Sequence, residues 1–567
     1  MACPRPKTSW RNALNAFAQR GLLSLIALLG VATGAQAFNG PFTQFVNVAP
    51  GVDLDVDVRW PDTGSPPAAG WPVLFFAHGA GGDKNANSGR ASEYADDGYV
   101  TLTYTNRPAE DRTPDNFAND IVAMKAWLLA DFEAAASVVV PVDTHAFGMT
   151  GNSLGGFTTW SGVLLTGAFA TAVPFNFAYH NLIDYVVSQG SIERVTGAPV
   201  AVEVGGEYPA DATDALIEAE MNSIFDNFPL VTIPVQNHIA MLDTRWTGTH
   251  ALTDYLALTA ASQRMIYLGT GGHGTPRTDD VFRDDLRRNW FAHHLKGVSN
   301  GVNLDDPIQI ALLDTNEHIS YPSWPPPGQT SDTLFLGENG RLNVNAPINN
   351  PPGDTFENDP GTLTWLSTTP DFGTATLRNQ VVRDVLSYDS DPLLADALIV
   401  GEPSVTLHVE GTGSRYQLNV HLFDLSPSSE RILLAVGTAT TDTSPNELTI
   451  PLSVTGRRVP AGHRLRLEIT NRDDQDVDPT DGYTVGGGTL RFIPFLEFST
   501  NQVFFDVARP SSISLPLVGS AELAFGKAAP TLSIGGLTAL AMGLAGVGSG
   551  WIHSRRRPPR SSTEQVD

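Results

Sequence analysis

The chain has 567 residues, and its 61 acidic against 35 basic side chains give a formal net charge of -26 at pH 7. An acidic surface of this size repels phosphate backbones and anionic headgroups, which excludes nucleic acid and anionic lipid as partners of the folded part. The single cysteine, Cys3, lies inside a predicted signal peptide, so the mature chain has no thiol for a disulfide, a cysteine nucleophile or a thiolate metal site.

The first 37 residues predict a signal peptide. Basic residues, among them Lys7, Arg11 and Arg20, precede an apolar run over residues 21–31, which closes on the small-residue triplet 35–37, Ala-Gln-Ala. A retained membrane anchor is the alternative, but the run is short for a bilayer span. We therefore expect an exported chain that begins at Phe38 after cleavage.

Residues 38–300 alternate strand-like apolar runs with helical spacings, which is typical of a sheet built from βαβ units. The predicted strands are Trp71–Ala77, Tyr99–Tyr104, His145–Met149, Val231–Met241 and Met265–Leu268. The predicted helices are Phe117–Leu129, one that starts at Leu154, His250–Ala261 and Asp284–Leu295. Residues 181–229 are less regular and more acidic, so we expect a short lid there. The pattern predicts an α/β fold class for this region.

A second domain of short alternating strands follows a Pro-rich stretch, residues 301–331, that we interpret as a linker. The strands predicted in residues 332–516 are Ser404–Glu410, Gln417–Leu425, Ile432–Thr438, Asn446–Val454, Arg464–Thr470 and Gln502–Val507. Turns rich in Gly, Pro, Asn and Asp separate them, and this composition predicts an all-β sandwich or jelly roll.

The C-terminal end predicts a membrane anchor. After a linker over residues 517–531, the Gly- and Ala-rich apolar segment 532–552 is long enough to span a bilayer as a helix. The arginines in the tail 553–567 place that tail in the cytoplasm and the preceding domains outside. This end also resembles bacterial C-terminal sorting tails of the Pro-Thr-Leu-Ser type, which implies a periplasmic or cell-surface protein, anchored or released by cleavage.

One serine stands in a sequence that favours nucleophilic catalysis. Residues 151–155, Gly-Asn-Ser-Leu-Gly, fit the G-x-S-x-G elbow, in which small neighbours permit a strained turn from a strand into a helix. The same pattern occurs at residues 297–301, but there it follows a helix and enters the Pro-rich stretch. The context therefore selects Ser153 as the nucleophile of an α/β-hydrolase.

The base and the acid are expected after later strands, in the chain order Ser, acid, His. His273 follows an apolar strand in a glycine loop, and Asp243 follows the strand before it. Asp243 would orient the imidazole and stabilise the imidazolium. Glu207 or Asp211, after a strand-like run over residues 200–205, is the rival acid.

An oxyanion hole needs two N–H donors near the nucleophile. The backbone N–H of Leu154 is one candidate. The other is expected in the loop His78–Gly82, from Gly79 or Ala80.

Several stretches together resemble one family. They are Gly51–Pro61, the elbow with Phe157–Trp160 behind it, Asp243 and His273 about thirty residues apart, Val385–Pro403, and the strand Gly462–Leu467 with the sequence GHRLRL. The chain resembles the cocaine esterase and Xaa-Pro dipeptidyl-peptidase family along these stretches. The resemblance implies an α/β-hydrolase fold with a lid insertion, followed by a jelly-roll domain.

The chain also departs from that family. Members carry Tyr directly after the nucleophile and a second Tyr in the oxyanion hole, whereas this chain has Leu154 and an HGAGG loop at residues 78–82. Such a loop is more similar to those of lipases and other esterases. The peptidase activity of the family therefore does not carry over directly.

We expect a serine hydrolase that needs no cofactor and cleaves a small ester or peptide substrate. A carboxylesterase-like activity is our first hypothesis. A dipeptidyl-peptidase or aminopeptidase, with Glu207 or Asp211 binding the substrate ammonium, is the alternative, and a non-catalytic surface binding protein is a further one. The acidic residues between Asp473 and Asp481 could hold Ca²⁺, but they lack the EF-hand spacing and favour a solvated turn without metal.

Overall fold

The computed structural model describes most of the two predicted domains. The described residues are 38–108, 111–181, 201–202, 206–207, 224–243, 246–273, 279–315, 317–359, 384–413, 416–441, 444, 446–471, 498–520 and 522–525. The predicted signal peptide, most of the lid, the acidic loop, and the helix 532–552 with its basic tail lie outside these residues. No helix within the described ranges is long and apolar enough to cross a bilayer.

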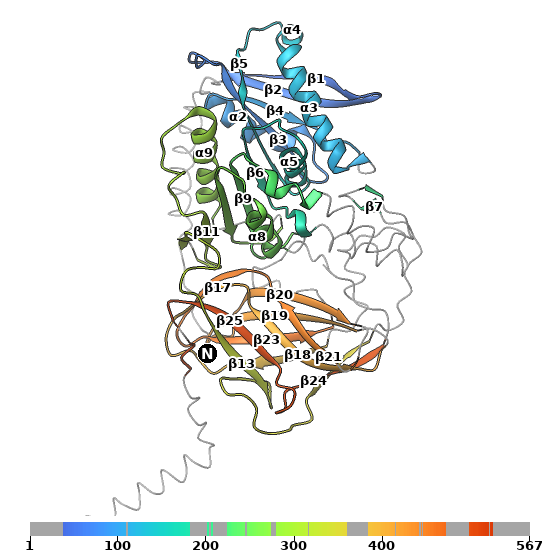
Figure 1. Ribbon diagram of the computed structural model, residues 1–567, viewed down its shortest axis with the longest axis vertical. Coiled ribbons are helices and arrows are strands. Elements are labelled where there is room, and N and C mark those ends of the chain that lie inside the picture. The colour runs from blue at the N-terminus through green and yellow to red at the C-terminus, as the bar shows by residue number, and fades with distance from the viewer. Residues whose placement is uncertain are drawn as a thin grey trace, which may run out of the picture.

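The first domain is built on a ten-stranded sheet in the order β1-β2-β4-β3-β5-β6-β9-β10-β11-β12 (Figure 1). Its strands are β1 Phe38–Ala49, β2 Val52–Pro61, β3 Trp71–Ala77, β4 Val100–Tyr104, β5 Val142–Asn152, β6 Thr171–Phe175, β9 Val235–Ala240, β10 Arg264–Gly269, β11 Ile308–Ala311 and β12 His318–Tyr321. The strands from β4 through β11 pair in parallel, and antiparallel pairs close both edges. This is the predicted α/β arrangement.

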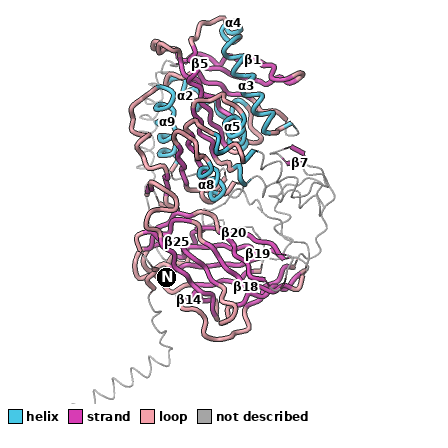
Figure 2. The backbone as a smooth tube through the Cα atoms, viewed as in Figure 1, coloured by secondary structure: helices cyan, strands magenta, loops and turns pink. Residues whose placement is uncertain are grey.

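Helices cover both faces of this sheet, as Figure 2 shows. They are α2 Ser88–Asp96, α3 Pro114–Ala130, α4 Phe132–Ala136, α5 Leu154–Leu165, α8 Gly248–Ala257 and α9 Asp280–Lys296. Successive strand residues point to opposite faces, so Phe75 of β3 packs with Ile121 of α3, whereas Leu74 and Phe76 pack with Trp290 of α9. Burial on both faces explains why β3 is an almost continuous apolar run.

Short elements occupy the connections of the first domain. They are the 3₁₀ turns η1 Lys84–Asn87, η3 Tyr179–Asn181 and η4 Phe228–Leu230, and the two-residue strands β7 Ala201–Val202 and β8 Gly206–Glu207. The parallel strands end at one edge of the sheet, and the loops after β3, β5, β9 and β10 begin there. Catalytic side chains on such loops can therefore meet.

The second domain is all β, and its thirteen described strands form one hydrogen-bonded network. They are β13 Thr330–Gly337, β14 Arg341–Asn343, β15 Asp354–Asn358, β16 Val385–Asp389, β17 Ala397–Gly401, β18 Ser404–Gly411, β19 Tyr416–Leu425, β20 Arg431–Thr441, β21 Asn446–Pro451, β22 Thr455–Val459, β23 Arg464–Thr470, β24 Ser499–Phe504 and β25 Ser512–Val518. Alternate residues of β18 are buried, which is the pattern of a strand with one face on a core. The GHRLRL motif begins β23, between β16 and β19.

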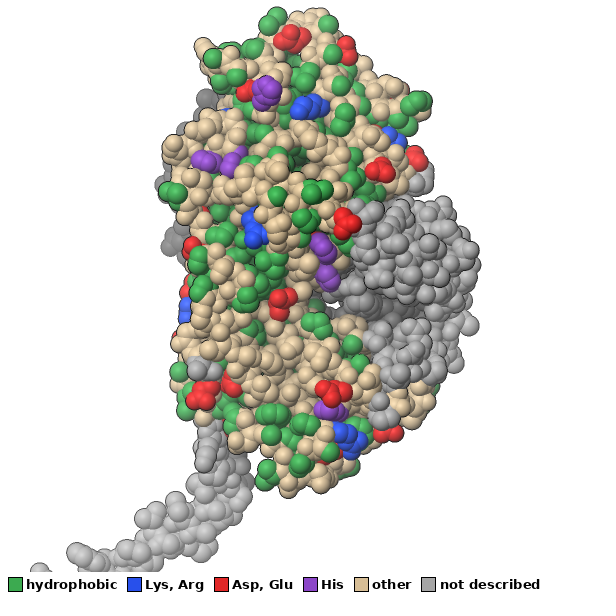
Figure 3. Space-filling model, in the orientation of Figure 1, with side chains coloured by type: hydrophobic (Ala, Val, Ile, Leu, Met, Phe, Trp, Pro, Cys, Tyr) green, Lys and Arg blue, Asp and Glu red, His purple; other side chains and the backbone are tan. Residues whose placement is uncertain are grey.

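The two domains share apolar packing. Met241 after β9, Leu312 after β11 and Val454 before β22 belong to one cluster of buried side chains that also includes Leu154 of α5. The β domain therefore packs directly on the loop edge of the first domain (Figure 1). Lys and Arg side chains lie singly on the face of the molecule shown in Figure 3.

The prediction that residues 301–331 form a linker is wrong for much of that stretch. β11 adds a buried parallel strand beside β10, with Ile308 opposite Ile266, and β12 pairs with β11. The prolines of residues 322–327 lie after both strands, and β13 already begins at Thr330. A strand of four residues, Ile-Gln-Ile-Ala, is too short to outweigh the Pro-rich composition of the whole stretch.

We expect His294 of α9 to make the protein less stable in acid. The ring of His294 lies 4.4 Å from that of Trp290, and its Nε2 is buried with no hydrogen-bond partner among the described residues. Burial, assisted by the neighbouring His293, lowers the pKa of His294 from 6.5 to about 4. Between these two values the unfolded chain binds a proton that the folded chain does not, so the free energy of unfolding should fall as the pH falls through this window.

We expect His294→Phe to reduce this loss, by up to about 2 kcal/mol between pH 7 and pH 4.5. Urea unfolding at both pH values measures the effect. The same change at exposed His145 is the control and should leave the pH dependence as it is. Equal acid losses in the wild type and the His294→Phe variant would contradict this explanation.

Candidate active site

Ser153 lies at a sharp turn between β5 and α5. Its backbone has φ 57° and ψ -118°, which L-residues rarely adopt, and its N–H donates to Phe175 O at 3.0 Å. Neighbouring glycines make the turn possible: a Cβ on Gly151 would lie 2.4 Å from Gly155 O, and one on Gly155 would lie 2.2 Å from Ala77 O. The sequence elbow is therefore a strained strand-to-helix turn, as its motif predicts.

The structure brings Ser153, His273 and Asp243 together, although they stand on three different loops. Ser153 Oγ lies 2.9 Å from His273 Nε2, and His273 Nδ1 lies 2.8 Å from Asp243 Oδ2. Because the carboxylate accepts a hydrogen bond from Nδ1–H, Nε2 is left as the acceptor for the serine hydroxyl. This is the connectivity of a nucleophile, a base and an orienting acid.

The carboxylate of Asp243 is held on its other side as well. Its side chain is fully buried, and Oδ1 accepts a hydrogen bond from the N–H of Trp246 at 3.0 Å. Trp246 in turn packs against Phe177, with 4.3 Å between the ring centroids. The orientation of the acid is thus fixed by backbone and packing, so it does not depend on His273 alone.

The loop after β3 passes beside the serine. A Cβ on Gly79 would lie 3.7 Å from Ser153 Cβ, whereas Ala80 is exposed. Leu154 is the first residue of α5, where N–H groups have no acceptor within the helix. The backbone of Gly79 and the N–H of Leu154 therefore both lie next to Ser153, where the sequence predicts an oxyanion hole.

His78 fixes the shape of this loop. Burial lowers the pKa of His78 below its ordinary value, which favours the neutral ring. Its Nε2 accepts from the N–H of Asn106 at 2.9 Å, so Nδ1 carries the proton and donates to Gly79 O at 2.7 Å. Because His78 holds the carbonyl oxygen of Gly79, the peptide group between Gly79 and Ala80 has one orientation.

Within the described residues, the structure does not bring the other candidate residues to this site. Glu207 is in β8, but its side chain lies outside the described residues, as does all of Asp211. Ser299 of the second G-x-S-x-G match lies in an exposed loop just after Gly297, which caps the end of α9. Ser299 therefore lacks the strand-to-helix turn.

Sequence reasoning missed Asp279, which holds both ends of the loop that carries His273. Asp279 is 2% exposed and lies just before α9. Its carboxylate accepts hydrogen bonds from Tyr267 Oη at 2.5 Å, Thr270 N at 3.2 Å and Thr270 Oγ1 at 2.9 Å. An aspartate before a helix is usually a simple cap, so the sequence gives no signal for this additional role.

We expect Asp279→Ala to lower kcat about tenfold, because the loop of His273 loses its brace. Stability should fall by about 2 kcal/mol, because buried donors lose their acceptor. Steady-state kinetics and urea unfolding measure both effects. Asp506→Ala is the matched control, since buried Asp506 accepts from Ala508 N and Arg509 N in the β domain. An equal loss of kcat in the control would contradict a role for Asp279 at the site.

Comparison with known proteins relates the chain to one group of hydrolases. Residues 300–513 match the family described as the X-Pro dipeptidyl-peptidase C-terminal non-catalytic domain. A protein of Mycobacterium tuberculosis provisionally named as a serine esterase is 27% identical over 161 residues, which are 27% of this chain and 25% of the relative. One of Streptomyces avermitilis, provisionally named as an Xaa-Pro dipeptidyl-peptidase, is 26% identical over 319 residues, 46% of this chain and 43% of the relative.

A solved structure extends the likeness to both domains. The CocE/NonD family hydrolase from Staphylococcus aureus superposes with a TM-score of 0.59 over 85% of this chain and 94% of its own, at 12% identity. This likeness concerns the fold. The chain spans a quarter to less than half of the length of the two curated relatives.

Proposed function

We propose that the chain is a serine hydrolase of the family of cocaine esterases and Xaa-Pro dipeptidyl-peptidases, and that it acts through an acyl-enzyme. The single observation that carries the proposal is the chain of contacts from Ser153 Oγ to His273 Nε2 and from His273 Nδ1 to Asp243, at 2.9 and 2.8 Å. A serine hydroxyl is a weak nucleophile, and such a base activates it.

In the proposed reaction, Ser153 Oγ attacks the substrate carbonyl carbon while its proton passes to His273 Nε2. Asp243 stabilises the resulting imidazolium, and the N–H groups of Leu154 and of Gly79 or Ala80 bind the oxyanion. His273 then protonates the departing alcohol or amine. Water then attacks the acyl carbon while His273 takes its proton, and His273 returns that proton to Ser153 Oγ as the bond to the acyl carbon breaks and the carboxylic acid leaves.

We place an ester first among the substrates. The loop beside Ser153 supplies backbone donors, as in esterases, and Leu154 is buried at the position where the family has Tyr. The relationship to an Xaa-Pro dipeptidyl-peptidase supports peptide hydrolysis as the second candidate. In that case Glu207 or Asp211 would bind the substrate ammonium, and reversing their charges should abolish any preference for free-amine substrates.

The deciding experiment compares p-nitrophenyl esters with Xaa-Pro p-nitroanilides. Turnover of esters together with labelling of Ser153 by a fluorophosphonate is the expected result, and Ser153→Ala should lose both. Anilide turnover that depends on Ser153 would favour the peptidase. No turnover and no labelling would leave a hydrolase fold that serves as a binding scaffold and would refute the proposal.

We also propose that the enzyme acts outside the cytoplasm. The charged start, the apolar run 21–31 and the triplet 35–37 support this part of the proposal. N-terminal sequencing of the protein from a native-like host should give Phe38 as the first residue. An intact N-terminus in a cytoplasmic fraction would contradict it.

A further inference from the structure

The loop that carries Asp243 contacts the β domain at both of its ends. We call residues 241–243 and 246–249, which follow β9 and include the first two residues of α8, the acid loop. A Cβ on Gly456 of β22 would lie 3.6 Å from the Sδ of Met241, and a Cβ on Gly248 would lie 2.6 Å from Val454 Cγ1. The acid loop therefore sits against residues 454–456 with no room for a larger side chain at Gly248.

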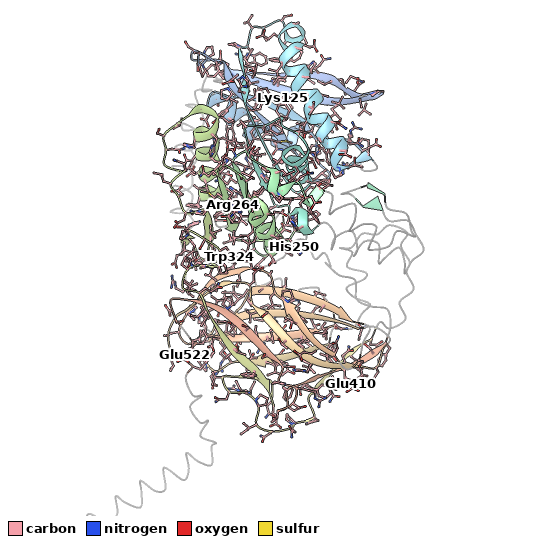
Figure 4. The ribbon with its side chains drawn as sticks, viewed as in Figure 1. Lys125, His250, Arg264, Trp324, Glu410 and Glu522 are labelled. Atoms are coloured by element: carbon pink, nitrogen blue, oxygen red, sulfur yellow. The ribbon has the colours of Figure 1, made fainter. Side chains whose placement is uncertain are left out.

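A hydrogen bond ties the exit of the acid loop to the same strand. The N–H of Val454 donates to Thr249 Oγ1 at 2.9 Å. The carboxylate of Glu402, which follows β17, lies within hydrogen-bonding reach of the hydroxyl of Thr249 and the indole of Trp324. Figure 4 labels Trp324 and His250, the residue after Thr249, where the first domain meets the β domain.

The β-domain side of this contact is itself rigid. Leu313 N donates to Gly456 O at 2.8 Å, and Arg457 Nη1 donates to Leu313 O at 2.7 Å. The same guanidinium donates through Nη2 to the fully buried carboxylate of Asp424 at 2.8 Å. A strand fixed in this way can hold the acid loop at a defined position.

The acid loop is short and internally bonded, so its ends determine where the carboxylate lies. Trp246 N donates to Asp243 Oδ1, and Thr247 caps α8 by accepting from His250 N at 3.3 Å. Thr249 is only the sixth residue after Asp243 in the sequence. A catalytic group must be held to about 0.5 Å, and a misplacement of about 1 Å can cost about a hundredfold in rate.

We propose that the β domain positions the catalytic acid: residues 454–456 hold Met241, Gly248 and Thr249, and so keep Asp243 in line with His273. The domain thereby takes part in catalysis without touching substrate, and Thr249 is a positioning residue. This inference rests on the proposed function, and it gives the β domain a role beyond packing.

The test compares two substitutions at one position. Thr249→Val keeps the shape of the side chain and removes both the acceptor of Val454 N and the hydroxyl that Glu402 contacts, so kcat for p-nitrophenyl esters should fall about tenfold with an unchanged KM. Thr249→Ser keeps the hydroxyl and should stay within about twofold of the wild type. The matched control is Thr253→Val on the exposed side of α8, whose hydroxyl donates to the backbone oxygen of Thr249, and it should leave kcat unchanged.

A double-mutant cycle separates positioning from general damage. If Thr249 acts through Asp243, Thr249→Val should have no further effect on the residual turnover of Asp243→Asn. A tenfold loss of kcat in both backgrounds, or no loss of kcat in the wild-type background, overturns the inference. In either case, turnover that depends on Ser153 still upholds the proposed function. Absence of Ser153-dependent turnover in the unaltered enzyme overturns both.

Discussion

Ser153→Gly should abolish turnover and yet give a more stable protein than Ser153→Ala. Both variants lack the nucleophile, so kcat should fall by about 10⁶-fold in each. They differ in the backbone, because a residue with a Cβ at φ 57° and ψ -118° is strained by about 1–3 kcal/mol, and glycine is not. After the greater chain entropy of unfolded glycine is allowed for, the glycine variant should be more stable by about 1 kcal/mol.

Kinetics on p-nitrophenyl esters and urea unfolding of the two variants measure this difference. Both variants should also fail to react with a fluorophosphonate. A glycine variant that is less stable than the alanine variant would mean that the elbow is not strained. Retained turnover in either variant would show that another residue is the nucleophile.

The sequence predicts the central strands well because their burial dictates their composition. β3 agrees with its predicted bounds, since both of its faces are covered by helices and nearly every residue is apolar. β11 was missed because it has only four residues, and its place beside β10 is visible only once Ile308 pairs with Ile266. Composition reports burial along a segment, but it does not report which distant strand a short segment joins.

The three members of the candidate site were predicted from their order along the sequence. The residues that hold them in place were not predicted. Ser153, Asp243 and His273 each follow a strand, so the order of strands was enough to select them. Asp279 and Thr249 look like ordinary residues at the start of a helix, and their contacts depend on packing between segments. The choice between Gly79 and Ala80 also stays open, because a donor is defined by the direction of its N–H and not by its residue type.

Each member of the proposed triad is braced by a different physical means. Close backbone contacts at Gly151 and Gly155 fix the serine, the carboxylate of Asp279 fixes the loop of the histidine, and the β domain contacts the loop of the acid. Because these braces are separate, damage to one should leave the others in place.

Asp243→Asn should lower kcat about 10⁴-fold with little change in KM. The amide still offers an oxygen to Trp246 N, so the acid loop should keep its shape. Its nitrogen, however, is a donor and cannot accept from His273 Nδ1. The imidazole would then carry its proton on Nε2, the nitrogen that must accept from Ser153, and the imidazolium would lose its counter-charge.

Steady-state kinetics, with thermal unfolding to confirm an intact fold, measure this effect. The control is Asp506→Asn in the β domain, also a buried aspartate, whose carboxylate accepts from Ala508 N at 2.9 Å. This control variant should be less stable, but its Asp243 still supports His273. Its kcat should therefore fall far less than that of Asp243→Asn. A loss of only a few fold in Asp243→Asn would reject Asp243 as the acid and direct attention to Glu207 and Asp211.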